Sequence, residues 1–221
     1  MESDKSKHSI HELAPLESGG VIARSGFIFQ DHVAASFLID MLKNHGLQEV
    51  WCETQDDITL IWLCDNHQEV EFVQVKNIEL GHFWSVAELC KREKTTASAP
   101  KIGTSILEKS LANDRFKEPC RFRMVTSLSV ISELKILALY LESPLRQSQN
   151  ENFSTLCKQV KQKVPDAISP NGHDSSWWLS NVFWDVRHTD DAVERKNVEA
   201  LANFASEIGG FLSPEDIRQK V

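Results

Sequence analysis

The sequence lacks the features that would assign it to a membrane, secreted or zinc-binding class. No apolar run approaches the length of a membrane span, and the amino terminus has no apolar signal core. The five cysteines form no CxxC pair, no Cys/His group has zinc spacing, and an odd cysteine count suits a reducing compartment. We therefore expect a soluble, cytoplasmic protein with free thiols and no membrane partner.

An excess of positive charge is also missing. The chain has 24 Lys and Arg against 32 Asp and Glu, a formal net charge of −8. This balance argues against a protein that coats nucleic acid through general electrostatic attraction. Any polyanion must therefore meet a local basic patch.

The length and composition are sufficient for one substantial core. The 221 residues are 41% hydrophobic, which favours one domain over two. Residues 1–20 lack apolar periodicity and end in two glycines, a pattern typical of a flexible leader. We expect the folded domain to cover 21–221, with a helical, Trp-rich extension at its C-terminal end.

The order of the predicted elements is mixed α/β. Apolar residues at three- and four-residue steps predict helices, and runs of β-branched and aromatic residues predict strands. The predicted strands are 47–53, 57–64, 69–76 and 120–128, with a strand pair inside the Trp-rich segment 174–188. The predicted helices are 25–45, 83–93, 103–116, 132–143, 151–163 and 191–208.

Two neighbouring strands end in polar residues. If residues 66–67 form a two-residue turn, Asp57 lies opposite Lys76 and Thr59 lies opposite Gln74. Period-two alternation then places these four side chains on one face of the sheet. The opposite face receives the apolar side chains Ile58, Leu60, Val73 and Val75.

This arrangement has a structural and a functional interpretation. Asp57 and Lys76 could form a cross-strand ion pair that contributes about 0.2 to 1 kcal/mol. The functional interpretation rests on the apolar setting, since partly desolvating both groups would gain little stability. A divalent cation such as Mg²⁺ takes oxygen ligands, which Asp57, the Gln74 amide and the Val75 carbonyl could supply. A neighbouring lysine could then orient water or stabilise a pentavalent phosphate.

The same residues also carry a family resemblance. "ETQDDI" followed by "QVK" resembles the core motif of the PD-(D/E)xK, or restriction-endonuclease-like, nucleases. The segments "SGGVIARSGFIFQDHVAA", "VWCETQDDITLIW", "VEFVQVKN", "SILEKSLANDRF" and "FRMVTS" together resemble the double-stranded DNA endonuclease domain of bacterial anti-phage effectors. The resemblance implies an α/β fold with a restriction-endonuclease-like mixed sheet flanked by helices.

The resemblance also implies roles for individual residues. Asp57 corresponds to the metal-binding aspartate, Gln74 to a second ligand that is usually acidic, and Lys76 to the active-site lysine. Gln30 corresponds to a polar residue of the first helix. An uncharged Gln at position 74 would lower the affinity for Mg²⁺ or Mn²⁺ unless Glu53 or Asp56 compensates. Strand register favours Asp57 as the ligand and predicts that Asp56 points to the opposite face.

Several candidates keep a structural alternative. Gln30 could be a core amide satisfied by the backbone, and Glu53 could cap a strand end in solvent. The Trp-rich segment could stack on bases, although alternating Trp is more often core. Two basic groups could bind DNA phosphates or form solvated faces. They are Lys91, Arg92 and Lys94, and Arg115, Lys117, Arg121 and Arg123.

The expected function is metal-dependent hydrolysis of double-stranded DNA with little sequence preference. By resemblance, the partner would be a sensor, either a SAVED domain that binds cyclic oligonucleotides or a STAND NTPase. The sensor would gather several nuclease domains into an oligomer, and this chain would be the nuclease part of a longer protein or a two-component system. A silent DNA-binding or assembly module and an RNA nuclease remain as alternatives.

Overall fold

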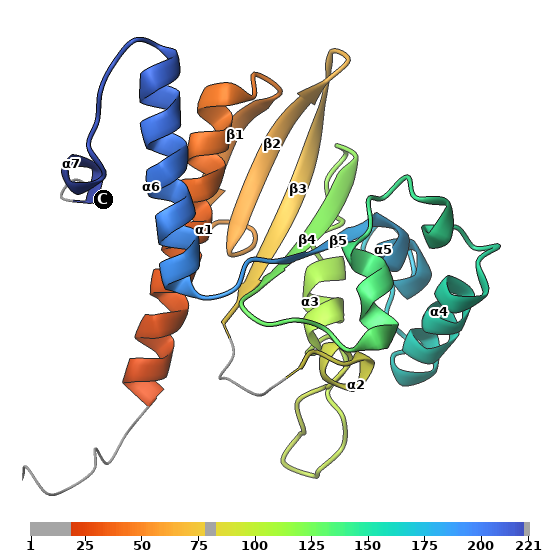
Figure 1. Ribbon diagram of the computed structural model, residues 1–221. Helices are drawn as coiled ribbons and strands as arrows, with labels where there is room; N and C mark the ends of the chain where they lie inside the picture. Colours follow the sequence, from red (N-terminus) through yellow and green to blue (C-terminus); the bar gives the residue numbers. More distant parts are fainter. Residues whose placement is uncertain (1–18, 78–82, 219–221) are drawn as a thin grey trace, which may run out of the picture.

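The computed structural model describes residues 19–77 and 83–218, and the side chains of 26–77 and 83–217. One five-stranded sheet has the order β1-β2-β3-β4-β5, with helices on both faces (Figure 1). The strands are β1 Leu47–Cys52, β2 Ile58–Cys64, β3 His67–Lys76, β4 Cys120–Thr126 and β5 Val182–Val186. The helices are α1 Gly19–Lys43, α2 Val86–Leu89, α3 Ile106–Leu111, α4 Glu151–Lys163, α5 Ser175–Asn181, α6 Asp190–Glu207 and α7 Pro214–Arg218, with 3₁₀ helices η1 Ser132–Ala138 and η2 Pro144–Arg146. The predicted mixed α/β class is confirmed.

The sheet combines antiparallel and parallel pairs. Strands β1, β2 and β3 are antiparallel neighbours, whereas β4 runs parallel to both β3 and β5. The parallel connections are long and carry the helices from α2 to α5, as parallel pairing requires. The C-terminal ends of β3, β4 and β5 therefore meet at one end of the sheet, the end at which β2 begins.

The predicted hairpin forms, but its register is shifted by two residues. Asp65 and Asn66 occupy the turn with φ of 43° and 70°, so Cys64 lies opposite His67. Thr59 consequently lies opposite Phe72, and the predicted Thr59–Gln74 and Asp57–Lys76 pairs are wrong. A shift of two residues leaves each side chain on its predicted face, because the strand repeat is also two.

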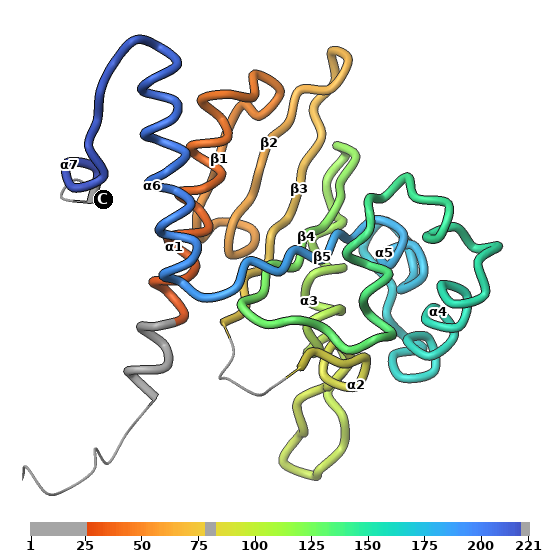
Figure 2. Tube along the Cα trace, viewed as in Figure 1, coloured from red at the N-terminus to blue at the C-terminus, as the bar shows by residue number. Residues whose placement is uncertain are grey.

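The two sheet faces have separate cores. One contains Phe29, Val33 and Phe37 of α1 against the odd-numbered apolar residues of β3. The other packs Phe72, Phe122 and Trp184 against the region from α2 to α5. Figure 2 shows the same division in the chain trace, with α1 and α6 side by side on one face. No helix in the described ranges is both long and apolar enough to cross a bilayer.

Several sequence predictions need correction. The Trp-rich segment is a helix, α5, followed by one strand, β5, rather than a strand pair. Trp178 and Trp184 are buried in the main core, which confirms the core interpretation for them. The predicted helix over 132–143 is a 3₁₀ helix, and α2 and α3 are shorter than predicted. Of the predicted leader 1–20, residues 1–18 lie outside the described residues, while Gly19 and Gly20 begin α1.

A buried arginine holds together the segments around α5. Arg146 is 3% exposed, and its two terminal nitrogens donate to the carbonyls of Leu137, Leu139, Leu179 and Val182 at 2.6 to 3.1 Å. Burial lowers the pKa of Arg146 to about 10, so the side chain stays charged at neutral pH. It therefore connects η1 to the junction of α5 and β5.

We expect Arg146→Met to lower the free energy of unfolding by about 3 kcal/mol, since four carbonyls would lose a charged donor. Denaturant unfolding measures the loss. Arg195→Met, at an exposed position of α6, is the matched control and should change stability by less than about 0.5 kcal/mol. Equal losses for the two variants would contradict the role of Arg146.

Candidate active site

The Asp57 side chain lies at the end of the hairpin where the β2–β3 ladder stops. The last main-chain pair is Ile58 with Val73. Beyond it, Asp57 Oδ2 accepts the Val75 N–H at 2.7 Å and lies 3.4 Å from Lys76 Nζ. The carboxylate thus replaces a main-chain acceptor of β3 and pairs with the ammonium group. Among the described residues, no hydrogen bond reaches Asp57 Oδ1, so this oxygen remains available.

Gln30 and Glu53 support the Asp57 backbone. Gln30 Nε2 donates to Glu53 Oε1 at 2.5 Å and to the Asp57 carbonyl at 3.4 Å. The Glu53 N–H donates to the same carbonyl at 3.0 Å, and Glu53 has a positive φ of 53° that closes the loop after β1. The structure therefore brings Gln30, Glu53, Asp57 and Lys76 together from α1, the β1–β2 loop and β3.

Gln74 presents a buried oxygen next to this group. It is 8% exposed, and its Oε1 has no hydrogen-bond partner in the described part of the chain. Thr59 Oγ1 is a second buried oxygen without a partner there, on the same sheet face and diagonal to Gln74. Buried polar atoms normally have partners, so two neighbouring exceptions suit a site that binds a ligand.

The sequence predicted that Asp56 points to the sheet face opposite Asp57, and this prediction is wrong. Asp56 Oδ2 accepts the Asn113 amide at 3.1 Å, and α3, which precedes Asn113, packs on the face of the sheet that carries Gln74. The alternation fails because residues 53–57 form bends rather than a strand. Burial raises the pKa of Asp56 to about 7, although the Asp57 N–H, Lys76 and Asn113 oppose this shift. Asn113 lies inside the predicted helix 103–116 and was not among the predicted site residues.

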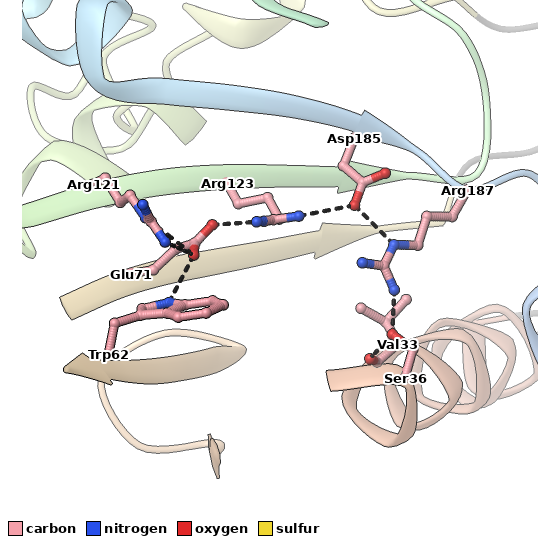
Figure 3. A network of polar contacts seen from close by, with 8 residues as sticks. All are labelled: Val33, Ser36, Trp62, Glu71, Arg121, Arg123, Asp185 and Arg187. Atoms are coloured by element: carbon pink, nitrogen blue, oxygen red, sulfur yellow. Dashed lines mark hydrogen bonds and ion pairs between the residues drawn. The ribbon is translucent and has the colours of Figure 1, made fainter. Parts of the chain in front are cut away.

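Arg121 and Arg123 lie on the sheet face opposite Gln74. Both guanidinium groups bind the buried carboxylate of Glu71, at 3.2 and 2.6 Å, and Trp62 donates to it as well (Figure 3). Arg123 also reaches Asp185, which is shared with Arg187 (Figure 3). These arginines balance the charge of the buried Glu71 and the half-buried Asp185, and contact between the arginines and DNA remains a prediction.

The other predicted DNA-binding residues follow α2. Arg92 forms a two-pronged ion pair with Glu108, whereas Lys91 and Lys94 are exposed. In the second basic group, Arg115 bonds Gln55 and Lys117 lies near Glu118. In these two groups, therefore, the arginines bond side chains of the same chain, whereas the lysines are exposed.

Comparison with known proteins identifies the family. Residues 18–220 match the family described as "Cap4, dsDNA endonuclease domain". The chain belongs to this family. This Cap4-family domain is 26% identical over 207 residues to Anti-bacteriophage protein A of Escherichia coli (strain K12), covering 93% of this chain and 37% of that protein. The predicted resemblance to endonuclease domains of anti-phage effectors is confirmed.

Solved structures agree with the fold of this Cap4-family domain. An Acinetobacter baumannii Cap4 SAVED/CARF-domain-containing receptor with 3'3'3'-cAAA gives a TM-score of 0.52 at 16% identity, covering 88% of this chain and 38% of that one. The same receptor with 2'3'3'-cAAA gives 0.50 at 14% identity, with the same coverage. At such identity the likeness shows the fold alone. The chain spans less than two fifths of the length of these relatives.

The oxygen donors of the Cap4-family domain fit a hard cation. Within the part of the chain that the structure describes, Asp57 Oδ1 and Gln74 Oε1 accept no hydrogen bond. The Val75 carbonyl lies on the same strand edge as its N–H, the edge toward Asp57, as the β-strand backbone requires. No cluster of three Asp, Glu, His or Cys suited to a metal occurs in the described residues. Mg²⁺ accepts such a set, because it binds through one or two carboxylates and keeps several waters or phosphate oxygens.

We expect Asp56→Asn to change how stability depends on pH. Because the folded-state pKa of Asp56 is raised from 3.8 to about 7, its contribution to stability is greatest at low pH and is lost as pH rises toward 7. In EDTA, the wild type should therefore lose about 1 to 3 kcal/mol between pH 5 and 8 that the neutral Asn variant retains. Denaturant unfolding at each pH measures the difference.

Asp40→Asn, at an exposed position of α1, controls for the general loss of one negative charge. Parallel stability curves for the wild type and Asp56→Asn would show that the environment of Asp56 does not raise its pKa.

Proposed function

We propose that the chain hydrolyses DNA phosphodiester bonds with Mg²⁺, or Mn²⁺, held beside Asp57, Gln74 and the Val75 carbonyl. The observation that carries this proposal is the contact of one carboxylate with both Val75 N–H and Lys76 Nζ, next to the unpartnered Gln74 oxygen. A structural ion pair would explain Asp57 and Lys76. It would not explain why two buried oxygens on the same face, Thr59 Oγ1 and Gln74 Oε1, have no hydrogen-bond partner among the described residues.

The residues of the chain have distinct tasks in this proposal. The Val75 N–H holds Asp57 Oδ2 and leaves Oδ1 free to bind the cation, while Gln30 and Glu53 fix the backbone of Asp57. When bound, the cation supplies positive charge at the scissile phosphate. The Lys76 ammonium group orients the attacking water and stabilises the charge that builds on the phosphate oxygens.

We further propose that the domain serves a cytoplasmic anti-phage effector. The support is the family and the name of the Escherichia coli relative. All five cysteines are free thiols, which suits the cytoplasm. The solved Cap4 relatives are receptors with a SAVED/CARF domain, so a sensor of that kind, or a STAND NTPase, is the proposed partner, with assembly as the trigger. Sequence preference should be weak, because phosphate contacts carry no base information.

We expect Lys76→Ala to lower plasmid cleavage at least 100-fold while the protein stays folded, because the ammonium group acts on the reacting phosphate. Cleavage of plasmid, single-stranded DNA and RNA with Mg²⁺ or EDTA is the measurement, and Lys158→Ala on α4 is the control. If Lys76→Ala keeps the anti-phage effect, the alternative of a silent DNA-binding or assembly module is favoured. If RNA is cleaved in preference to DNA, the alternative of an RNA nuclease is favoured.

We expect Gln74→Glu to lower the Mg²⁺ concentration needed for half-maximal cleavage about 3- to 30-fold, since a second carboxylate strengthens a hard-cation site. Gln74→Leu, which replaces the amide with an apolar side chain of similar size, should raise that concentration instead. Metal titrations of the three proteins measure the shift. Identical titrations would place the cation away from Gln74.

A further inference from the structure

The segment between α2 and α3 is strongly basic in an acidic chain. Its sequence, "KREKTTASAPKIGT" over 91–104, has four cations and one carboxylate, whereas the whole chain has a net charge of −8. It projects as a loop beyond α2 and α3, at the end of the molecule where β3 terminates (Figure 1). This is also the end of the sheet that carries Asp57 and Lys76, so the loop and the candidate active site share one end.

The base of this loop is fixed by a buried ion pair. Arg92 Nε lies 3.1 Å from both Glu108 oxygens, and Nη2 lies 2.5 Å from Oε1. Burial would raise the pKa of Glu108, but hydrogen bonds from Arg92 and Ser105 outweigh it and lower the pKa to about 2. Glu108 is therefore ionised at physiological pH, and the guanidinium plane is held in one orientation.

A hollow of about 300 Å³ lies beside this ion pair. Arg92, Lys94 and Lys163, the last residue of α4, line it, and the rest of the lining is Ala87, Cys90, Ser98 and Pro100. Neither Lys94 nor Lys163 forms an ion pair with any residue that the structure describes. Arg92 Nη1 makes no hydrogen bond within the same residues, and Asp166 Oδ2 lies 3.9 Å from it. Fold anchoring accounts for the Arg92–Glu108 pair but not for two further lysines around the same hollow.

We infer that Arg92, Lys94 and Lys163 form a phosphate-binding pocket that holds a backbone phosphate of the DNA duplex away from the scissile bond. Lys94 and Lys163 have no carboxylate partner among the described residues, so they repel each other and Arg92, and a bound polyanion removes this cost. The three cations are donors for phosphate oxygens, and Glu108 holds Arg92 in one orientation before any ligand binds. The inference rests on the proposed function, because it assumes that DNA approaches the Asp57 end of the sheet.

The carboxylates near the pocket leave it positive. Glu108 is engaged by Arg92, and Glu93 pairs with Lys109 at 3.1 Å. Asp166 is exposed and lies at the rim near Arg92. Counting Arg92, Lys94 and Lys163 against Glu108 and Asp166 gives a net charge of +1. One phosphodiester group carries one negative charge, which matches this balance.

The test is DNA affinity rather than cleavage. All proteins carry Lys76→Ala, so that with Mg²⁺ the duplex can bind without being cut. Lys94→Gln/Lys163→Gln should weaken binding of a labelled 20-base-pair duplex about 10-fold at low salt, and should reduce the slope of log affinity against log salt by about 1. Fluorescence anisotropy over a salt series measures both quantities. Arg92 stays unchanged because its substitution would unfold the base of the loop.

Lys158→Gln/Lys196→Gln is the matched control, since it removes the same charge from exposed positions on α4 and α6. Equal affinity and slope for the pocket variant and its parent would show that the pocket does not bind a DNA phosphate, without contradicting the proposed function. A parent that does not bind duplex would overturn both. If inorganic phosphate or AMP binds the parent but not the pocket variant, while both bind duplex equally, the pocket takes a small phosphate, and the DNA inference is wrong.

Discussion

The hydrogen bond from the Val75 N–H to the Asp57 carboxylate is the interaction on which the candidate site depends. It forms where main-chain pairing between β2 and β3 ends, so a side-chain carboxylate takes the place of a main-chain carbonyl as the acceptor for β3. One carboxylate oxygen is thereby fixed beside Lys76, and the other accepts no hydrogen bond from the described residues. Gln30 and Glu53 hold the backbone of the same residue from the other side. Loss of this bond would free both the loop after β1 and the end of β3.

Charge is divided between the two sheet faces in a way that explains which basic residues remain free. On the α1 face, the buried Glu71 and the half-buried Asp185 bind the guanidinium groups of Arg121, Arg123 and Arg187. Arginine suits this task because its several N–H donors let Arg123 bond Glu71 and Asp185 at the same time. On the other face, the lysines around the 91–104 loop keep flexible ammonium groups in solvent. Arg121, Arg123 and Arg187 are thus engaged within the fold, whereas these lysines are exposed.

Local patterns could predict much of the fold and part of the site. The helix over 151–163 and the hairpin were predictable because periodicity and turn residues act over a few positions. The register was not, because Asp65–Asn66 and Asn66–His67 are both acceptable turns in sequence, and the choice depends on packing. The direction of Asp56 was wrong because alternation holds only inside a strand. The Asn113 contact and the approach of Lys163 to Lys94 join distant segments that no local pattern connects.

By itself, the sequence determined which side chains could do chemistry and which sheet face they share, because the period of a strand is set by its backbone. It also determined the family, since several motifs occur in the same order. Tertiary structure decided which oxygens lack partners, which arginines are engaged by carboxylates, and where a basic hollow forms. These outcomes depend on distances between segments far apart in the chain, and burial and charge pairing are properties of that arrangement alone.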